Sequence, residues 1–347
     1  MSRASAAPFD AVLLVSFGGP QGPADIRPFL SNVLRGRNIP AARLEEVAHH
    51  YELFGGVSPL TTYTMEQADG LRRELASRGL PLPVYVGMRN WAPLLPDVLQ
   101  HMARDGVRRA IGVLAAAQRS YSSCTQYRHN VRQANEELVA AGGRAVEVTY
   151  VGDWHRHEGF TAAVADHTRQ AYERLPPDLR SRARLAFTAH SIPAHMPGVA
   201  MYQQHLRDSA ADVAALLGVA DWTLTYQSRS GRPEDPWLEP DINDWIRGEH
   251  AKGRLEAVVV SPIGFVCDHI EVLYDLDHEA RATCDELGVA MARASSVNAH
   301  PAFVSTLADA VSATWDRYRS GRALPLVNAE QPNARELPPP VRPSAAG

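Results

Sequence analysis

Short apolar runs alternate with longer segments that carry apolar residues at every third or fourth position along most of the chain. Runs of four to eight β-branched and apolar residues are typical of buried strands, and the three-to-four spacing is typical of amphipathic helices. Strands that alternate with helices predict parallel sheets with crossover helices. Eight strands are expected, at 11–17, 82–88, 109–116, 145–152, 184–190, 222–228, 256–262 and 289–294.

The predicted strands form two groups of four, which indicates two α/β domains, the first at 8–152 and the second at 153–299. A last helix from Pro301 is expected to cross back, so that 300–320 joins the first domain. A cleft between two such domains commonly binds a ligand. Other helices are expected, for example, at 42–53, 65–77, 125–141, 161–174 and 201–217.

The end of the chain has a different composition. From Leu324 onward it is rich in Pro, Ala and Asn and has no apolar period. Such a segment cannot bury enough apolar surface to offset the entropy lost on ordering. We therefore predict that 324–347 is a disordered tail.

Charge and cysteine content narrow the classes of function. A net charge of −4 gives no general attraction to nucleic acid or to an anionic membrane, so a small-molecule partner is expected. Cys124, Cys267 and Cys284 lie far apart without CxxC spacing, which fits a reducing compartment, and we expect the cytoplasm. The apolar run 11–15 is too short for a signal peptide, and no segment approaches the roughly 20 apolar residues of a transmembrane helix.

The stretch LAFTAHSIP contains the first candidate for chemistry. His190 lies at the carboxyl end of a predicted strand, and Pro193 prevents the strand from continuing. Ligands of open parallel sheets bind outside these carboxyl ends. The alternative is a loop histidine whose hydrogen bonds are satisfied by backbone, but its position favours a ligand site.

Five carboxylates follow the strand at 256–262 in the stretch SPIGFVCDHIEVLYDLDHEA. On an α-helix four of them project within roughly 80° of one another, and Asp277 points the opposite way, toward water. The remaining four are Asp268, Glu271, Asp275 and Glu279.

Two interpretations of this acidic ridge remain open. Asp268 and Glu271 fit a D-x-x-E capping box for a helix that begins near Asp268. Capping does not explain Asp275 and Glu279, which are then either a solvated face or a row of oxygen ligands for a divalent cation or for protons. Glu271 and His190 both follow strands of the second group; a carboxylate and a neutral imidazole suit Fe²⁺ or Zn²⁺ and also form an acid-base pair.

Weaker signals lie in the first half. Arg35 and Arg37 in NVLRGRNIP can bind carboxylates bidentately or be solvated. The Gly-Gly pair of LFGGVSP can bring Ser58 to an anionic group or simply end a helix. The hydroxyl-rich segment RSYSSCTQYRHN, which includes Tyr127, can cap a helix or bind a polar ligand.

Together these motifs resemble the ferrochelatase family, whose members insert Fe²⁺ into a porphyrin in haem synthesis. The resemblance covers about 10–320 and rests on LLVSFGGP, YELFGGVSPL, FTAHSIP, YQSRSG…PWLEPD and PIGFVCDHIEVLYDLD. SFGGP and YSSCTQY are closest to the bacterial branch that metallates coproporphyrin III rather than protoporphyrin IX. The resemblance implies two Rossmann-like, chelatase-type domains, each a four-stranded parallel sheet flanked by helices, with the porphyrin held between them.

The resemblance also implies roles for individual residues. His190 and Glu271 match the metal site of the family, and Asp275 and Glu279 match an outer metal path. The matches to porphyrin-contacting positions are Ser58, Tyr127, Tyr51 and Arg35.

The chain departs from the family pattern at several positions. Phe17 stands where relatives can have an iron-ligating tyrosine, and a phenyl ring cannot ligate. His50 replaces the arginine of a family Arg-Tyr pair, and Leu34 replaces another arginine, with Arg35 beside it. Some members bind a [2Fe-2S] cluster through four cysteines near the C-terminus, but no cysteine follows Cys284 here, so no cluster is expected.

The predicted function is therefore insertion of Fe²⁺, as substrate, into coproporphyrin III by a cytoplasmic monomer that binds no nucleic acid. The alternatives are a protoporphyrin IX ferrochelatase, a chelatase for Co²⁺ or Ni²⁺ and another tetrapyrrole, and a haem or metal carrier without turnover.

Overall fold

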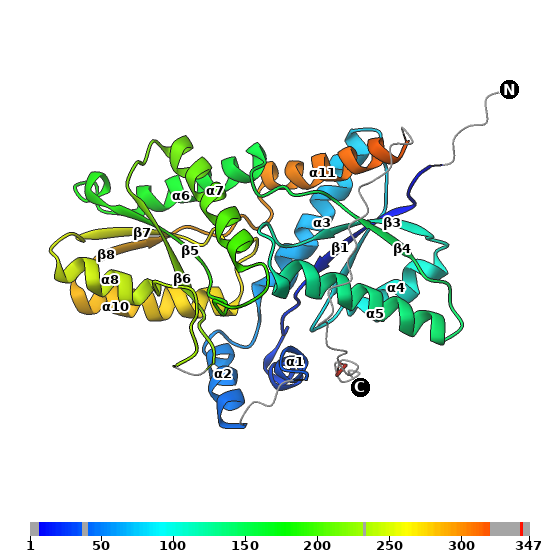
Figure 1. Ribbon diagram of the computed structural model, residues 1–347, viewed down its shortest axis with the longest axis horizontal. Helices are drawn as coiled ribbons and strands as arrows, with labels where there is room; N and C mark the ends of the chain where they lie inside the picture. Colours follow the sequence, from blue (N-terminus) through cyan, green and yellow to red (C-terminus); the bar gives the residue numbers. More distant parts are fainter. Residues whose placement is uncertain (1–6, 37–40, 232–233, 320–340, 343–347) are drawn as a thin grey trace. The chain divides into compact units, whose positions relative to one another are not determined.

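The computed structural model describes residues 7–36, 41–231, 234–319 and 341–342. Arg37 and nearly all of the predicted tail lie outside the described residues. The described residues form two compact units, coloured by sequence in Figure 1. Unit 1 takes its residues from Met1–Ala115, Ser122–Gly152 and Val304–Gly347, and unit 2 from Ala116–Tyr121 and Asp153–Phe303.

Unit 1 contains a four-stranded parallel sheet with the strand order β2-β1-β3-β4. The central strand β1 (Ala11–Ser16) is buried along its whole length, as expected for a strand covered on both faces. It pairs with β2 (Val84–Met88) and β3 (Arg109–Leu114), and β4 (Glu147–Tyr150) pairs with β3 at the edge of the sheet.

Helices cover both faces of this sheet. Alternate residues of β1 pack with α4 (Leu95–Arg104) and α5 (Gln126–Ala140) in one apolar core. A π-helical turn at Tyr121–Thr125 leads into α5. The remaining helices of this unit are α1 (Ile26–Val33), α2 (Ala41–Leu53), α3 (Pro59–Ser77) and, from Val304 on, α11 (Pro301–Arg319), with a 3₁₀ turn at Pro23–Asp25.

The last helix, α11, packs against α3. Arg78, which follows α3, forms an ion pair with Asp309 at 2.6 Å, and Gly70 of α3 lies so close to Val304 that a Cβ there would come within 3.0 Å of its methyl carbon. Near the other end of α11, the ring of Tyr318 packs edge-on against Phe9. The C-terminal helix therefore completes the packing of the first unit.

Unit 2 contains a second four-stranded parallel sheet, with the strand order β6-β5-β7-β8. Its strands are β5 (Arg184–His190), β6 (Trp222–Gln227), β7 (Ala257–Ser261) and β8 (Ala290–Arg293). Because β5 lies between β6 and β7, the segments that follow all three strands emerge side by side at one edge of the sheet.

Two helical layers enclose this sheet (Figure 1). One face packs in an apolar core with α8 (Ile242–Ala251) and with a continuous helical stretch made of α9 (Ile270–Val272), a π-helix at Leu273–Ala280 and α10 (Arg281–Leu287). The other helices of the unit are α6 (Glu158–Arg174) and α7 (Val199–Leu217), with a 3₁₀ turn at Arg180–Arg182.

All eight predicted strands are present, within a few residues of their expected ends, and they form the two predicted parallel sheets. The fold prediction is confirmed. Among the described helices, none is long and apolar enough to cross a membrane.

Candidate active site

The sheet of unit 2 brings His190 and Glu271 together. His190 is the last residue of β5, and Glu271 lies in α9, after the loop that follows the neighbouring strand β7. Nε2 of His190 is 3.5 Å from Oε1 of Glu271, and the two side chains are 36% and 42% exposed. The expectation that both follow adjacent strands and face one site is therefore met by the geometry.

The hydrogen bonds of His190 orient its ring. Nδ1 contacts the carbonyl oxygen of Ser191, and because a carbonyl can only accept, Nδ1 carries the proton. The lone pair of the neutral ring is then on Nε2, which faces Glu271. The carbonyl of the residue that follows β5 thus orients the basic nitrogen toward the carboxylate.

The charges of His190 and Glu271 shift the pKa of both side chains. Burial by itself would lower the pKa of His190, but the Glu271 carboxylate and the bond to Ser191 raise it above its usual value. Burial opposes ionisation of Glu271, but the positive charge of His190 and its hydrogen bond hold the pKa of Glu271 at about 2. The pair is therefore suited to holding a proton on the imidazole and a negative charge on Glu271.

Asp275 lies next along the helical segment and behaves differently. Ser228 donates its hydroxyl hydrogen to Oδ2 of Asp275, and Nε2 of Gln227 donates to the same oxygen at 3.2 Å. Burial, followed by the negative charges of Glu271 and Glu279, raises the pKa of Asp275 to about 7. This carboxyl group can therefore gain or lose a proton near neutral pH.

Sequence reasoning did not select Ser228 or Gln227 as site residues. Gln227 ends β6 and is paired in register with His190, which places it at the same edge of the sheet. Ser228 has a φ of 62°, in the left-handed region that non-glycine residues rarely occupy. Both residues lie in the motif YQSRSG, but their partner Asp275 is far away in the sequence, so the motif by itself did not indicate their role.

The helix containing the ridge is not a regular α-helix. Asp275 and Glu279 lie in the π-helix Leu273–Ala280, in which hydrogen bonds join residues five apart and each turn is wider than in an α-helix. Residues four apart therefore remain close to one face, and Glu279 still acts electrostatically on Asp275. The predicted row Glu271, Asp275 and Glu279 is retained, although the α-helical geometry assumed for it is wrong.

The predicted role of Asp268 as a helix cap is also wrong. The N-cap is His269, whose Nδ1 accepts from the amide of Val272 at 3.4 Å. Asp268 is buried and instead pairs with Arg293 at 2.8 Å, while its backbone amide donates to Oδ1 of Asn298. The guanidinium of Arg293, at the end of β8, thus binds the carboxylate that the local sequence assigned to helix capping.

Asp277 was predicted to point toward water, but it forms an ion pair. Its Oδ1 accepts from Nε of Arg293 at 2.8 Å, and its side chain is only 35% exposed. Arg293 therefore binds two acids of the ridge stretch and fixes this segment to β8. Of the five acids, these two are structural, and the other three form the row that begins beside His190.

The four residues predicted to contact porphyrin belong to unit 1. Ser58 is buried at the start of α3 and lies against Gly19, where a Cβ would come within 2.7 Å of its hydroxyl oxygen. The SFGGP and GGVSP motifs thus meet at one turn. Tyr127 is buried in the core beside α4.

Tyr51 and Arg35 lie near the two helices that follow β1. The ring of Tyr51 packs against Phe29 with centroids 5.6 Å apart, and Phe29 also packs against Phe17 at 6.3 Å. Arg35 donates from Nε to the carbonyl of Asn32 at 3.0 Å, and burial lowers its pKa. Phe17 therefore serves as a packing residue of this cluster.

Comparison with known proteins identifies the family and agrees with the fold. The sequence model of a family described as Ferrochelatase matches residues 9–314. A ferrochelatase of Rhodopirellula baltica is 46% identical over 300 residues, covering 86% of this chain and 84% of the relative. A coproporphyrin III ferrochelatase of Streptomyces coelicolor is 45% identical over 326 residues, covering 88% of this chain and 85% of the relative.

A solved structure has a similar fold at low sequence identity. SirB from Bacillus subtilis, determined with Fe³⁺, superposes with a TM-score of 0.53 at 13% identity, covering 89% of this chain and 97% of that chain. At this identity the likeness bears on the fold alone.

Proposed function

The chain belongs to the ferrochelatase family, and on this premise we propose that it is a lyase that inserts Fe²⁺ into coproporphyrin III, giving Fe-coproporphyrin III for haem synthesis. Relatives about 45% identical over most of the chain carry that activity in their names, which supports the substrate. The observation that carries the site is the His190–Glu271 pair, with Nε2 and Oε1 3.5 Å apart beside Asp275.

Insertion requires that two pyrrole N–H protons leave the ring and that hydrated Fe²⁺ loses water. Nε2 of His190 is the proposed proton acceptor, because its lone pair is oriented by the bond from Nδ1 to Ser191. The raised pKa makes this nitrogen a stronger base, and Glu271 stabilises the imidazolium that forms. General-base help of this kind contributes about 10²- to 10⁴-fold in rate.

Glu271 provides the negative charge of the site. Its pKa of about 2 keeps it ionised at neutral pH, so it can offer an oxygen to the incoming cation. Fe²⁺ accepts both carboxylate oxygen and imidazole nitrogen. Since one nitrogen cannot hold a proton and a metal at once, His190 must release its proton before it can act as a ligand.

Asp275 and Glu279 form the proposed route for that proton or for the cation. A group with a pKa of about 7 exchanges protons readily at neutral pH, and Asp275 lies four residues after Glu271 on the helical segment. Glu279 is exposed and ends the row toward solvent. We propose that this row connects the His190 site with water.

Unit 1 supplies the proposed porphyrin contacts, Ser58, Tyr127, Tyr51 and Arg35. A guanidinium suits a propionate carboxylate, which assigns Arg35 to the propionates in place of the family arginine at Leu34. Phe17 offers no axial ligand, which favours release of the metallated product.

Anaerobic Fe²⁺ insertion assays of His190→Ala and Glu271→Gln test the site. Each rate should fall at least about 100-fold, in line with the loss of a general base or of its partner charge. Glu286→Gln is the matched control, because this exposed glutamate of α10 only pairs with Arg247 and should leave the rate unchanged. Near-normal rates in both site variants would refute the assignment.

The substrate is tested by kcat/KM for coproporphyrin III and protoporphyrin IX with the same Fe²⁺ supply. We expect coproporphyrin III to be preferred. One relative bears only the name ferrochelatase at 46% identity, so protoporphyrin IX is the alternative, and a preference for it would overturn the choice. Haem binding at one equivalent without multiple turnovers would instead indicate a carrier.

Three further expectations remain predictions. Cys124, Cys267 and Cys284 are free thiols, as a reducing cytoplasm would allow. Three cysteines cannot supply the four thiolates of a [2Fe-2S] cluster, so iron enters only as substrate. The monomeric state is to be checked by light scattering.

A further inference from the structure

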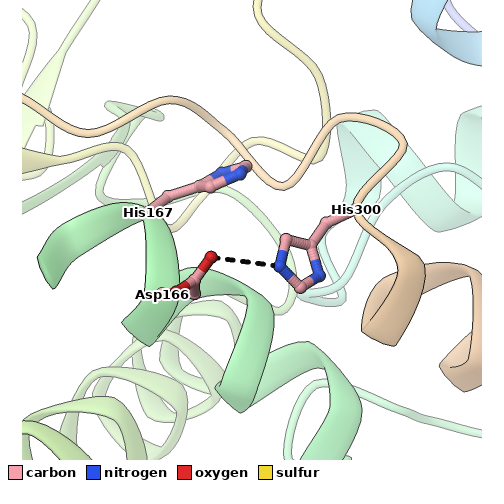
Figure 2. A group of neighbouring side chains, drawn as sticks. All are labelled: Asp166, His167 and His300. Atoms are coloured by element: carbon pink, nitrogen blue, oxygen red, sulfur yellow. Dashed lines mark hydrogen bonds and ion pairs between the residues drawn. The ribbon is translucent and has the colours of Figure 1, made fainter. Parts of the chain in front are cut away.

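A second group of metal-binding side chain types lies in unit 2, apart from His190. Asp166 and His167 follow one another on α6, and His300 immediately precedes α11 (Figure 2). One ligand atom from each residue lies within 4.8 Å of those of the other two. Within the described part of the chain, this is the one group of three or more His, Cys, Asp or Glu side chains with such spacing.

His167 has a nitrogen available for a metal. Its Nδ1 is 2.8 Å from the carbonyl oxygen of Ser296, so Nδ1 carries the proton and the neutral ring has its lone pair on Nε2. A backbone carbonyl that binds one ring nitrogen is a common way of orienting a metal-binding histidine. The loop after β8 therefore fixes the tautomer that a metal site requires.

Asp166 and His300 already contact each other. Oδ2 of Asp166 is 3.3 Å from Nε2 of His300, the interaction dashed in Figure 2. The rings of His167 and His300 are 5.2 Å apart and nearly perpendicular, at 81°. The three side chains thus approach one region from two elements, and each is partly exposed.

His300 must change tautomer to bind a metal. Its Nδ1 accepts from the amide of Ala302 at 3.1 Å, so the neutral ring carries its proton on Nε2, toward Asp166. A cation at Nε2 requires that proton on Nδ1, and the ring stays neutral. Two hydrogen bonds, from Ala302 to Nδ1 and from Nε2 to Asp166, are then lost, and metal bonds to Nε2 and to the Asp166 carboxylate replace them.

We propose that Asp166, His167 and His300 form a second cation site, which takes a borderline divalent ion such as Zn²⁺ through two imidazole nitrogens and one carboxylate oxygen. Ligands about 2.1 Å from one ion lie at most about 4.2 Å apart, so the side chains must move slightly closer. Their partial exposure allows that movement and lets water complete the coordination. The ion joins α6 to the residue just before α11, both within unit 2, and takes no part in metallation at His190.

The proposal is tested by measuring Zn²⁺ binding to a double variant of the full chain. This variant carries both His190→Ala and Glu271→Gln, which together remove the first site. Competition with a chromogenic chelator should give one equivalent of bound Zn²⁺. Adding His167→Ala or Asp166→Asn should weaken that binding on the order of 100-fold, since each removes a ligand. Adding His250→Ala, a partly buried histidine of α8 outside the cluster, should change nothing.

Asp166→Asn keeps the shape of the side chain, so the test does not depend on whether the alanine variant folds. Absence of Zn²⁺ binding in the parent double variant would overturn the proposal, as would equal binding by the cluster variants and the His250 control. In the otherwise unchanged chain, His167→Ala should metallate porphyrin at the wild-type rate. That assay separates this proposal from the proposed function, and a reduced rate would contradict the independence of the two sites.

Discussion

Glu271 and Asp275 are four residues apart on one helical segment, yet their pKa values are shifted in opposite directions. The imidazole of His190 holds the pKa of Glu271 at about 2, whereas burial and the charges of Glu271 and Glu279 raise that of Asp275 to about 7. Two acids of similar chemistry are thereby given different tasks, one as a fixed negative charge and one as a group that exchanges protons.

The raised pKa of Asp275 predicts a stability effect with a definite sign. Between about pH 4 and 7 the folded chain holds a proton there that the unfolded chain has released, so this group lowers stability as pH rises. Asp275→Asn cannot ionise and avoids that loss. Its stability relative to wild type should increase by on the order of 1–3 kcal/mol across this range, as measured by urea unfolding. A difference independent of pH would contradict the raised pKa.

Ser228 should tune the same group. Its hydroxyl donates to Asp275 and favours the ionised carboxylate, so Ser228→Ala should raise the pKa of Asp275 further. If Asp275 relays protons, the acidic limb of the kcat/KM profile for metallation should move up by about 0.5–1 pH unit. Ser230→Ala, at an exposed position two residues on, is the control and should leave the profile in place.

At the scale of elements, Arg293 at the end of β8 fixes the helical segment that carries Glu271. Its guanidinium binds Asp268, before α9, and Asp277, within the π-helix, both at 2.8 Å. The Asp268 side chain is 7% exposed and that of Arg293 is 11% exposed, so this is a buried pair. Such a bond restrains the direction of the segment and with it the position of Glu271.

Arg293→Met should therefore destabilise the protein by about 3–5 kcal/mol, because Asp268 is left as a buried charge without its cation. Metallation should also fall, through misplacement of Glu271. Arg247→Met is the comparison, since Arg247 pairs with the exposed Glu286 and should cost no more than about 1 kcal/mol. Equal unfolding free energies for the two variants would show that the buried pair does not hold the segment.

At the scale of the whole molecule, the chain returns to its first unit through α11. Leu307 and Val311 of this helix are almost fully buried. Burying each such side chain contributes about 1.5–3 kcal/mol, and the sum is a large share of the total stability of a typical domain. The C-terminal helix is therefore part of the fold of a unit whose first strand begins about 290 residues earlier.

Truncation distinguishes this helix from the segment after it. A chain ending at residue 300 should lose cooperative unfolding, because the surface that α11 covers becomes exposed. A chain ending at residue 323 should unfold cooperatively and metallate porphyrin, since it loses only the exposed Arg342–Asp97 pair and the bonds between Val341 and Asn32 among the described contacts. Circular dichroism on heating compares the two, and loss of cooperativity in the longer chain would contradict this division.

The sequence alone determined the strands, the two parallel sheets and the family. Each strand is a short apolar run, and the pattern of burial along a strand is local, so it can be recognised without knowledge of contacts. His190 was found for the same reason, because strand ends and a following proline are visible in LAFTAHSIP. The row of Glu271, Asp275 and Glu279 followed from spacing on a helix.

Only the tertiary structure decided which acids act together. Nothing in the local sequence shows that Arg293, 25 residues after Asp268, takes that carboxylate away from helix capping, or that Ser228 reaches Asp275 across 47 residues. The 3.5 Å approach of His190 and Glu271 likewise depends on β5 and β7 being neighbours. These features depend on contacts between distant segments. The spacing of residues along the chain indicates only local geometry and does not reveal such contacts.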